Sequence, residues 1–235
     1  MNTAEKNFES LASNTYPGRG IVIGASPNGA SMFQIYWIMG RSENSRNRIF
    51  IEEHGFVKTK AFDEAKMEDP SLIIYYPIKH INGFHIVTNG DQTDTLYNFI
   101  RDGKTFEQAL AERTFEPDAP NFTPRISGII NPDYSFKLSI IKNAASGEPA
   151  PAHFFFNYAT CGNGCGFCIT TYAGDGSPLP SFEGEPYKLP VFATAEENLS
   201  RYWNGINDGN KISILVKEIK MDSGSFNIVI KNKLV

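Results

Sequence analysis

Short runs of β-branched and aromatic residues recur along the chain and are separated by turn-forming residues. Runs of this kind, bounded by Gly, Pro, Asn and Asp, predict β-strands. The predicted strands are Gly20–Ala25, Met32–Met39, Phe50–Lys58, Ser71–Ile78, Phe84–Thr88, Arg125–Ile130, Ser135–Lys142, His153–Tyr158, Phe167–Tyr172, Ile212–Met221 and Phe226–Lys231. The turn signature Ser26–Gly29 between the first two runs is typical of a hairpin.

Three segments instead space their apolar residues at the 3.6-residue period of a helix. They predict helices over Asp94–Asp102, Thr105–Arg113 and about Thr194–Asn204. In the second segment, Thr105 and Gln108 have the spacing of a capping box. Strands, helices, strands, a helix and strands follow one another, which indicates an α+β fold of stacked sheets covered by helices.

Length and charge narrow the class of protein. A chain of 235 residues can bury one large core, so we predict a single domain over 1–235, with 1–15 as a flexible or peripheral segment. The net charge of −4 argues against nucleic acid as the main partner. No apolar run reaches the roughly 20 residues that span a bilayer. The polar N-terminus lacks the apolar core of a signal peptide, so we expect a cytoplasmic protein without membrane contact.

A block of arginines stands out in this acidic chain. Arg41, Arg46 and Arg48 are interleaved with hydrogen-bonding side chains, namely Ser42, Asn44, Ser45 and Asn47. A guanidinium group presents paired donors that match phosphate oxygens. The block therefore predicts a site for a small phosphorylated ligand. The alternative is a solvated strand edge that discourages aggregation.

The cysteines Cys161, Cys165 and Cys168 have the spacing of a cluster-binding loop in radical SAM enzymes. Only 67 residues follow Cys168 (235 − 168), too few for the barrel of that family. A zinc site would need a fourth ligand, for which His153 is the nearest candidate. The interpretation we favour is a Gly-rich hairpin loop with free thiols, and redox chemistry is a further alternative. We therefore predict no metal site.

Three polar segments follow or precede predicted strands, where binding sites are often built. In Thr88–Asp94, either acceptors for a ligand or simple helix caps at Thr93 and Asp94 explain the composition. Glu116 and Asp118 lie in a Pro-rich approach to a strand, and a surface role explains them equally well. The segment Thr171–Glu185 mixes Gly, Pro and apolar residues as a lid or ligand-lining loop would.

The ordered motifs resemble the archaeal-type IMP cyclohydrolase family and its bacterial relatives. They are Tyr16-x-Gly18-Arg19, Arg41-Ser42 followed by Asn44–Arg48, the tyrosine pair Tyr75-Tyr76 before Lys79, Thr88–Asp94, and Thr123–Gly128. The resemblance covers about residues 16–130. The cysteine hairpin and the Thr171–Glu185 loop have no counterpart in it.

The resemblance implies a four-layer αββα sandwich similar to that of the N-terminal nucleophile hydrolases, without a nucleophile at the N-terminus. It implies closure of a formamido-imidazole-carboxamide ribotide to inosine monophosphate with loss of water, and no cofactor. The implied substrate-binding residues are Arg19, Arg41, Ser42, Asn44, Arg46, Arg48, Asn89, Gly90, Asp91 and Thr93. Tyr75 is expected to donate a proton or hold the oxyanion, Glu116 to deprotonate or orient the amide, and Lys79 or Arg125 to stabilise the oxyanion.

Two other functions are compatible with the same residues. One is an amide-type C–N hydrolase acting on another phosphorylated substrate, with Asp175, Glu183 and Glu185 on its loop. The other is a non-enzymatic nucleotide-binding protein. Proximity of Tyr75 and Glu116 to the arginines favours the cyclohydrolase. A homo-oligomer is allowed by every one of these interpretations.

Overall fold

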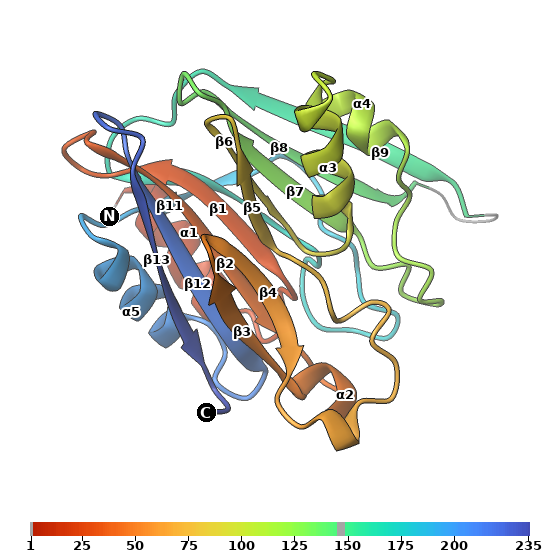
Figure 1. The fold of residues 1–235 in the computed structure, drawn as a ribbon. Coiled ribbons are helices and arrows are strands. Elements are labelled where there is room, and N and C mark those ends of the chain that lie inside the picture. The colour runs from red at the N-terminus through yellow and green to blue at the C-terminus, as the bar shows by residue number, and fades with distance from the viewer. Residues whose placement is uncertain (1, 145–148) are drawn as a thin grey trace.

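Two antiparallel sheets lie face to face in the computed structural model, which describes residues 2–144 and 149–235 (Figure 1). The first sheet has the order β11-β10-β1-β2-β12-β13 and the second the order β3-β4-β5-β6-β7-β8-β9. The first comprises β1 (Gly20–Ala25), β2 (Ser31–Met39), β10 (Cys165–Thr170), β11 (Tyr187–Pro190), β12 (Lys211–Lys220) and β13 (Phe226–Asn232). The second comprises β3 (Arg48–Glu53), β4 (Phe56–Ala61), β5 (Ile78–Ile81), β6 (Phe84–Thr88), β7 (Arg125–Ile130), β8 (Phe136–Asn143) and β9 (Pro151–Tyr158).

The central strands are buried on both faces, which explains their nearly continuous apolar sequences. In β1, Ile21 and Ile23 point into the core between the sheets, whereas Val22 points to the opposite side. This alternation follows from the two-residue period of a strand. Helices must therefore cover the outer face of each sheet.

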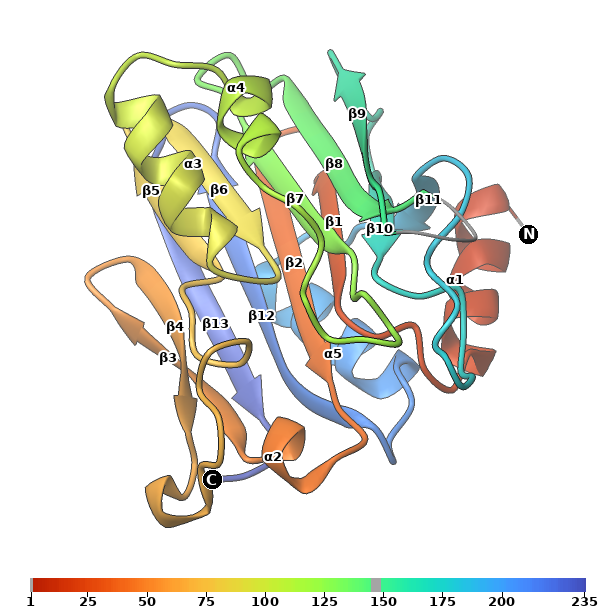
Figure 2. The same ribbon diagram turned by 90° about the vertical axis from the view of Figure 1, so that its right-hand side faces the viewer.

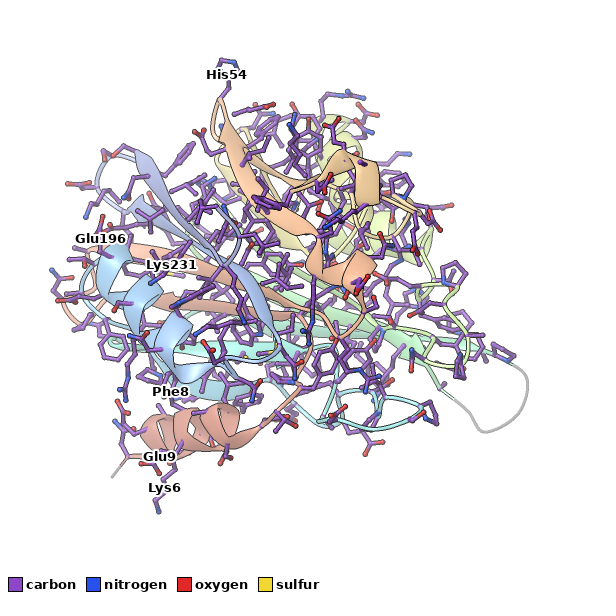
Figure 3. The ribbon with its side chains drawn as sticks, turned by 90° about the horizontal axis from the view of Figure 1, so that it is seen from below. Lys6, Phe8, Glu9, His54, Glu196 and Lys231 are labelled. Atoms are coloured by element: carbon purple, nitrogen blue, oxygen red, sulfur yellow. The ribbon has the colours of Figure 1, made fainter. Side chains whose placement is uncertain are left out.

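Helices α1 (Thr3–Ser13) and α5 (Ala195–Gly205) cover the first sheet (Figure 2). Phe8 of α1 meets Tyr202 of α5 edge-on, and Tyr202 stacks on Trp37 of β2. Figure 3 shows Phe8 between these helices, whereas Lys6 and Glu9 point outward. The segment 1–15, expected to be flexible or peripheral, thus contributes a helix to this outer layer.

Helices α3 (Gln92–Arg101) and α4 (Phe106–Ala111) cover the second sheet. Leu96 and Phe106 pack with Ile86 and Ile129 in a separate apolar cluster. The predicted capping box of Thr105 and Gln108 is present. The residue preceding α3 is Asp91, and its side chain makes no cap hydrogen bond, so neither Thr93 nor Asp94 caps this helix.

Two strand predictions were wrong. Phe50–Lys58 is a hairpin of β3 and β4, because His54 and Gly55 adopt positive φ angles of 54° and 81° at its tip. Figure 3 shows His54 projecting from the body of the protein. Most of Ser71–Ile78 is irregular, since the backbone N–H groups of Ile73 and Ile74 both donate to the Pro70 carbonyl.

Three further short elements complete the described chain. They are β11, helix α2 (Glu43–Arg46) and a 3-10 turn, η1 (Glu64–Lys66), and the apolar pattern predicted none of them. Within residues 2–144 and 149–235, no helix has the length and apolar character needed to cross a membrane.

Candidate active site

A cavity of about 280 Å³ opens where the ends of β2 and β10 meet the beginnings of β1, β3 and β7. We call it the arginine cavity. Its lining consists of Tyr16, Gly18, Arg19, Met39, Arg41, Ser42, Ser45, Arg48, Asp118, Asn121, Thr123, Thr171, Tyr172 and Leu179. Segments far apart in the sequence therefore share one wall.

Gly18 allows two of these segments to approach closely. Its φ is +72°, a conformation that favours glycine. A Cβ atom there would lie 2.2 Å from Thr171 Oγ1 and 2.5 Å from the ring of Tyr172. The glycine of the Tyr16-x-Gly18-Arg19 motif thus brings Arg19 against the loop that follows β10.

Arg19, Arg41 and Arg48 converge on the cavity, whereas Arg46 does not. The Arg48 side chain is almost fully buried, and its Nε donates to the Ser45 carbonyl oxygen at 2.7 Å. Its Nη1 has no hydrogen-bond partner in the described part of the chain, and burial lowers the pKa of Arg48. A buried unpaired donor is costly. An anionic ligand would remove that cost.

Arg19 forms an ion pair with Glu116, which is not part of the cavity lining. Its Nη1 donates to Glu116 Oε1 at 2.7 Å, and both side chains are shielded from solvent. Burial by itself lowers the pKa of Arg19, but Glu116 and nearby tyrosines raise it well above its ordinary value. Burial raises the pKa of Glu116, and Arg19 and Arg125 oppose that rise. The pair keeps a permanent cation at the inner end of the cavity.

Arg41 lies at the rim, where about two fifths of its side chain is exposed. Its Nη1 donates to Asp175 Oδ1 at 2.6 Å and to the Gly176 carbonyl at 3.1 Å. Its guanidinium carbon lies 5.1 Å from the centre of the Tyr16 ring. Arg41 therefore ties the Thr171–Glu185 loop to the end of β2.

Tyr75 lies behind the arginines rather than in the cavity lining. Its hydroxyl is 2.7 Å from that of Tyr36 on β2, and both side chains are buried. Burial, and then Tyr75, raise the pKa of Tyr36 well above its ordinary value. Tyr76 points elsewhere and packs edge-on against Phe56. Only one of the two adjacent tyrosines thus faces the arginines.

The remainder of the arginine block has structural contacts. Arg46 Nε donates to the Gly40 carbonyl at 3.0 Å, and its Nη2 donates to Asn210 Oδ1 at 3.2 Å. Ser42 lines the cavity and caps α2 by accepting from the Ser45 N–H. Asn44 reaches the Asp69 carbonyl, at 3.5 Å. The block is therefore divided between the cavity and the surface beside it.

Residues 89–93 lie outside the arginine cavity, and Asp91 and Gln92 among them accept hydrogen bonds from Arg125. The Asn89 side chain accepts from Ile126 N–H and donates to the Pro124 carbonyl. Asp91 Oδ1 accepts a hydrogen bond from Arg125 Nη1 at 2.7 Å, and Asp91 also forms an ion pair with Arg113. Burial raises the pKa of Asp91, but the two arginines lower it below its ordinary value. These contacts connect the segment before α3 to the start of β7.

Two more members of the predicted set complete this region. A Cβ atom on Gly90 would lie 2.6 Å from Gln92 Oε1 and 2.7 Å from Arg125 Nη1, so a larger residue there would displace these two hydrogen-bonded groups. The Thr93 hydroxyl is 2.6 Å from that of Thr88. Lys79 lies farther away: its Nζ pairs with Asp94 at 2.6 Å and sits over the Tyr76 ring at 4.3 Å.

Sequence reasoning did not select several residues of this region. Asp118, Thr123 and Tyr172 line the cavity and are joined by hydrogen bonds. Thr123 was visible as the start of the Thr123–Gly128 motif, and Tyr172 as the second residue of the Gly- and Pro-rich Thr171–Glu185 loop. Tyr36 carries no sequence signal, because an aromatic residue in an apolar strand is the ordinary core pattern.

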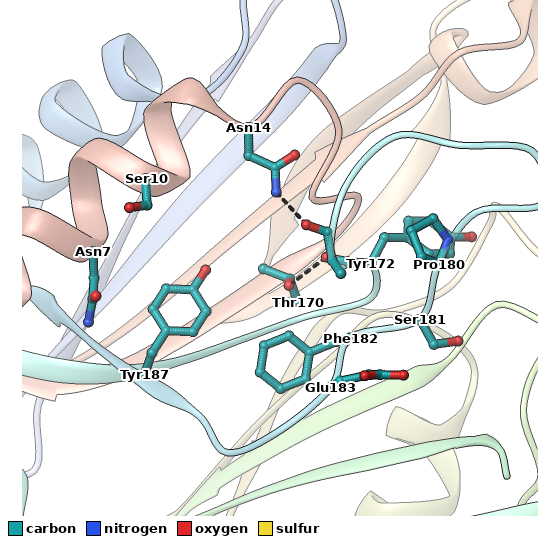
Figure 4. A pocket seen from close by; sticks show the side chains of 11 residues that line it. Asn7, Ser10, Asn14, Thr170, Tyr172, Pro180, Ser181, Phe182, Glu183 and Tyr187 are labelled. Atoms are coloured by element: carbon teal, nitrogen blue, oxygen red, sulfur yellow. Dashed lines mark hydrogen bonds between the residues drawn. The ribbon is translucent and has the colours of Figure 1, made fainter.

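A second cavity, of about 530 Å³, lies between α1 and the loop after β10 (Figure 4). Asn7 and Asn14 line it from the helix side, and Phe182 and Tyr187 form an aromatic wall opposite. Both side-chain amides of its lining donate hydrogen bonds, Asn14 to the Ala173 carbonyl and Asn7 to that of Lys188. Tyr172 lines both cavities.

The three cysteines are free and flank the start of β10. Burial raises the pKa of Cys161 to about 11 and that of Cys168 to about 12. His153, considered as a fourth zinc ligand, instead contacts the Arg113 carbonyl through Nε2. No three His, Cys, Asp or Glu side chains of the described chain come together as metal ligands would.

Residues 16–223, which contain every residue lining the arginine cavity, match the family model described as IMP cyclohydrolase-like protein. Among curated proteins, the IMP cyclohydrolase of Methanosphaera stadtmanae is 32% identical over 121 residues, 49% of this chain and 58% of that protein. This chain thus spans little more than half of that relative. The IMP cyclohydrolase of Methanopyrus kandleri is 28% identical over 170 residues, 71% of this chain and 79% of that protein. Since the model covers most of its length, the chain belongs to the IMP cyclohydrolase-like protein family.

Proposed function

We propose that this protein is an IMP cyclohydrolase of purine biosynthesis, which closes a formamido-imidazole-carboxamide ribotide to inosine monophosphate with loss of water. The observation that carries the proposal is the convergence of Arg19, Arg41 and Arg48 on one cavity in a member of this family. Three guanidinium groups are suited to a phosphate dianion. The ligand is a small phosphorylated purine precursor, and the reaction takes place in the cytoplasm.

The reaction needs little beyond positioning, because both reacting groups belong to one molecule. The enzyme holds the carboxamide nitrogen against the formyl carbon, stabilises the developing oxyanion and moves protons. In this proposal Glu116 and Tyr75 act from behind the lining by setting the position and charge of Arg19 and Arg48. Arg125 and residues 89–93 hold Glu116 and its segment, and Lys79 supports the neighbouring wall. Asn44 and Arg46 support the rim.

For the fold, we propose two further layers outside the two stacked sheets. Helices on the outer face of each sheet support a four-layer αββα arrangement similar to that of the N-terminal nucleophile hydrolases. The arginine cavity lies at one end of the paired sheets. In this proposal the fold is used without an N-terminal nucleophile.

The test is to incubate purified protein with the formylated ribotide and follow the absorbance of inosine monophosphate. We expect turnover by the wild type and a KM at least tenfold higher for Arg41→Ala, because the variant loses a phosphate contact. A wild-type protein that binds the ribotide without converting it would favour the non-enzymatic interpretation. An active wild type with an unaffected Arg41→Ala variant would refute only the role of Arg41.

A further inference from the structure

Among the described residues, Asp118 is the only carboxylate in the lining of the arginine cavity. Glu116, two positions earlier, is buried against Arg19 and is absent from that lining. Asp118 is partly exposed and lines the same cavity as Arg19 and Arg48. A carboxylate in the wall of such a cavity can reach the N–H groups of a bound ligand and act as a general base.

The hydrogen bonds of Asp118 leave both carboxylate oxygens able to accept a further proton or hydrogen bond. Thr123 N–H donates to Oδ1 at 2.6 Å, and the Thr123 hydroxyl donates to Oδ2. Each carboxylate oxygen thus has one donor from the protein and keeps a further lone pair. Both bonds come from a single residue, so the carboxylate is held in one orientation.

The chain of bonds continues to Tyr172, and its direction is determined. The Thr123 hydroxyl has one proton and gives it to Asp118, so its oxygen must accept from the Tyr172 hydroxyl. Burial raises the pKa of Tyr172 above its ordinary range, which keeps this tyrosine protonated as a donor. In the array Tyr172–Thr123–Asp118, both hydroxyl protons therefore point along the array toward the carboxylate at its cavity end.

We propose that Asp118 is the proton carrier of the cyclisation, held in place by Thr123 and Tyr172. This inference rests on the proposed cyclohydrolase function. In it Asp118, rather than Glu116, deprotonates the amide. Asp118 takes a proton from the carboxamide nitrogen as that nitrogen bonds to the formyl carbon and the C=O π pair moves onto oxygen. It returns this proton to the oxygen, which gives a neutral carbinolamine.

The second half of the reaction uses the same group. Asp118 takes the proton of the former formamido nitrogen, whose electron pair forms the C=N bond as the C–O bond breaks. The departing hydroxide receives that proton from Asp118 and leaves as water. Every proton removed is returned to the departing oxygen, so the carboxylate ends ionised and no further reactant is required.

The experiment compares Asp118→Asn and Tyr172→Phe with wild type, using kcat, its pH dependence and the Kd for inosine monophosphate. The amide introduced by Asp118→Asn keeps an acceptor for Thr123 but cannot carry a proton, so kcat should fall by about 100-fold or more. The Kd should stay within about threefold of wild type. The loss of kcat at low pH, caused by protonation of a carboxylate base, should disappear. Asp222→Asn, in the exposed turn between β12 and β13, is the matched control.

The Tyr172→Phe variant keeps the ring that stacks on Tyr16 and removes only the hydroxyl, so it decides the case if Asp118→Asn does not fold. Its kcat should fall by about 5- to 10-fold with product affinity intact. Full activity of either folded variant alongside an active wild type would overturn the role of Asp118 and leave the cyclohydrolase standing. A wild type that does not convert the ribotide would overturn both.

Discussion

The guanidinium of Arg19 and the carboxylate of Glu116 form a buried ion pair, 2.7 Å apart, at the inner end of the arginine cavity. Arg19 precedes β1, and Glu116 lies 97 positions later in the approach to β7. The pair therefore links the two sheets at the point where the cavity forms. Its geometry leaves Arg19 oriented toward the cavity and Glu116 behind it.

Replacement of Glu116 by Leu should destabilise the protein by about 3 kcal/mol, because a buried Arg19 charge then has no counterion. Urea unfolding at neutral pH measures this change. The double variant Arg19→Met/Glu116→Leu should regain most of the loss, since no buried charge remains, yet should stay inactive. A double variant as unstable as the single one would show that the pair is not the cause.

Arg48→Met should weaken the binding of inosine monophosphate at least tenfold, because it removes the unpaired buried donor of the cavity. Stability should be unchanged or higher by about 1 kcal/mol, since a desolvated charge is lost as well. Titration calorimetry and urea unfolding measure the two effects. Arg101→Met, on the exposed face of α3, is the control. Equal affinity in both variants would contradict the assignment of Arg48.

Asp175→Asn should tighten product binding by about two- to tenfold at low ionic strength, because Asp175 competes with a phosphate for Arg41. The stability change should be below about 1 kcal/mol, as for other exposed ion pairs. The gain in affinity should shrink as salt is added. Weaker binding by the variant would instead mean that Asp175 holds Arg41 in its binding position.

Lys217 predicts a pH dependence of stability. It is fully buried on β12, its Nζ has no hydrogen-bond partner within the described residues, and it lies 3.9 Å from the Phe226 ring centre. Desolvation lowers its pKa to about 7. The titratable groups facing it are His80 and His85, and burial lowers the pKa of each, that of His85 to about 3. Neither histidine offers Lys217 a counterion.

Above pH 7 the unfolded chain therefore binds more protons at Lys217 than the folded chain, so stability rises with pH until the unfolded lysine titrates near 10.5. Between pH 7 and 8.5 this term should add about 1–2 kcal/mol. Urea unfolding of wild type and Lys217→Met at both pH values isolates it, because all other groups cancel in the difference. Parallel pH dependence in the two proteins would refute the low pKa.

Local sequence patterns predicted the strands and helices whose apolar residues all face a core. Runs of β-branched and aromatic residues placed β1, β2, β6 and β7, because both faces of these strands are largely buried and the runs end at turns. The period of 3.6 residues placed α3 and α5. It was also present at Ala4, Phe8 and Leu11 of α1, but the polar residues between them obscured it. Ser71–Ile78 has the composition of a strand, but its backbone groups bond within a turn and to Thr59.

The amino-acid sequence by itself determined an α+β chain of paired sheets, the membership of Arg19, Arg41 and Arg48 in ordered motifs, and the family. It could not separate Arg48 from Arg46, Tyr75 from Tyr76, or Asp118 from Glu116. Residues one or two positions apart can point in opposite directions, and which direction faces a cavity depends on segments distant in the chain. Only the tertiary structure brought the loops after β2 and β10 and before β7 to one wall, and so decided which charges meet.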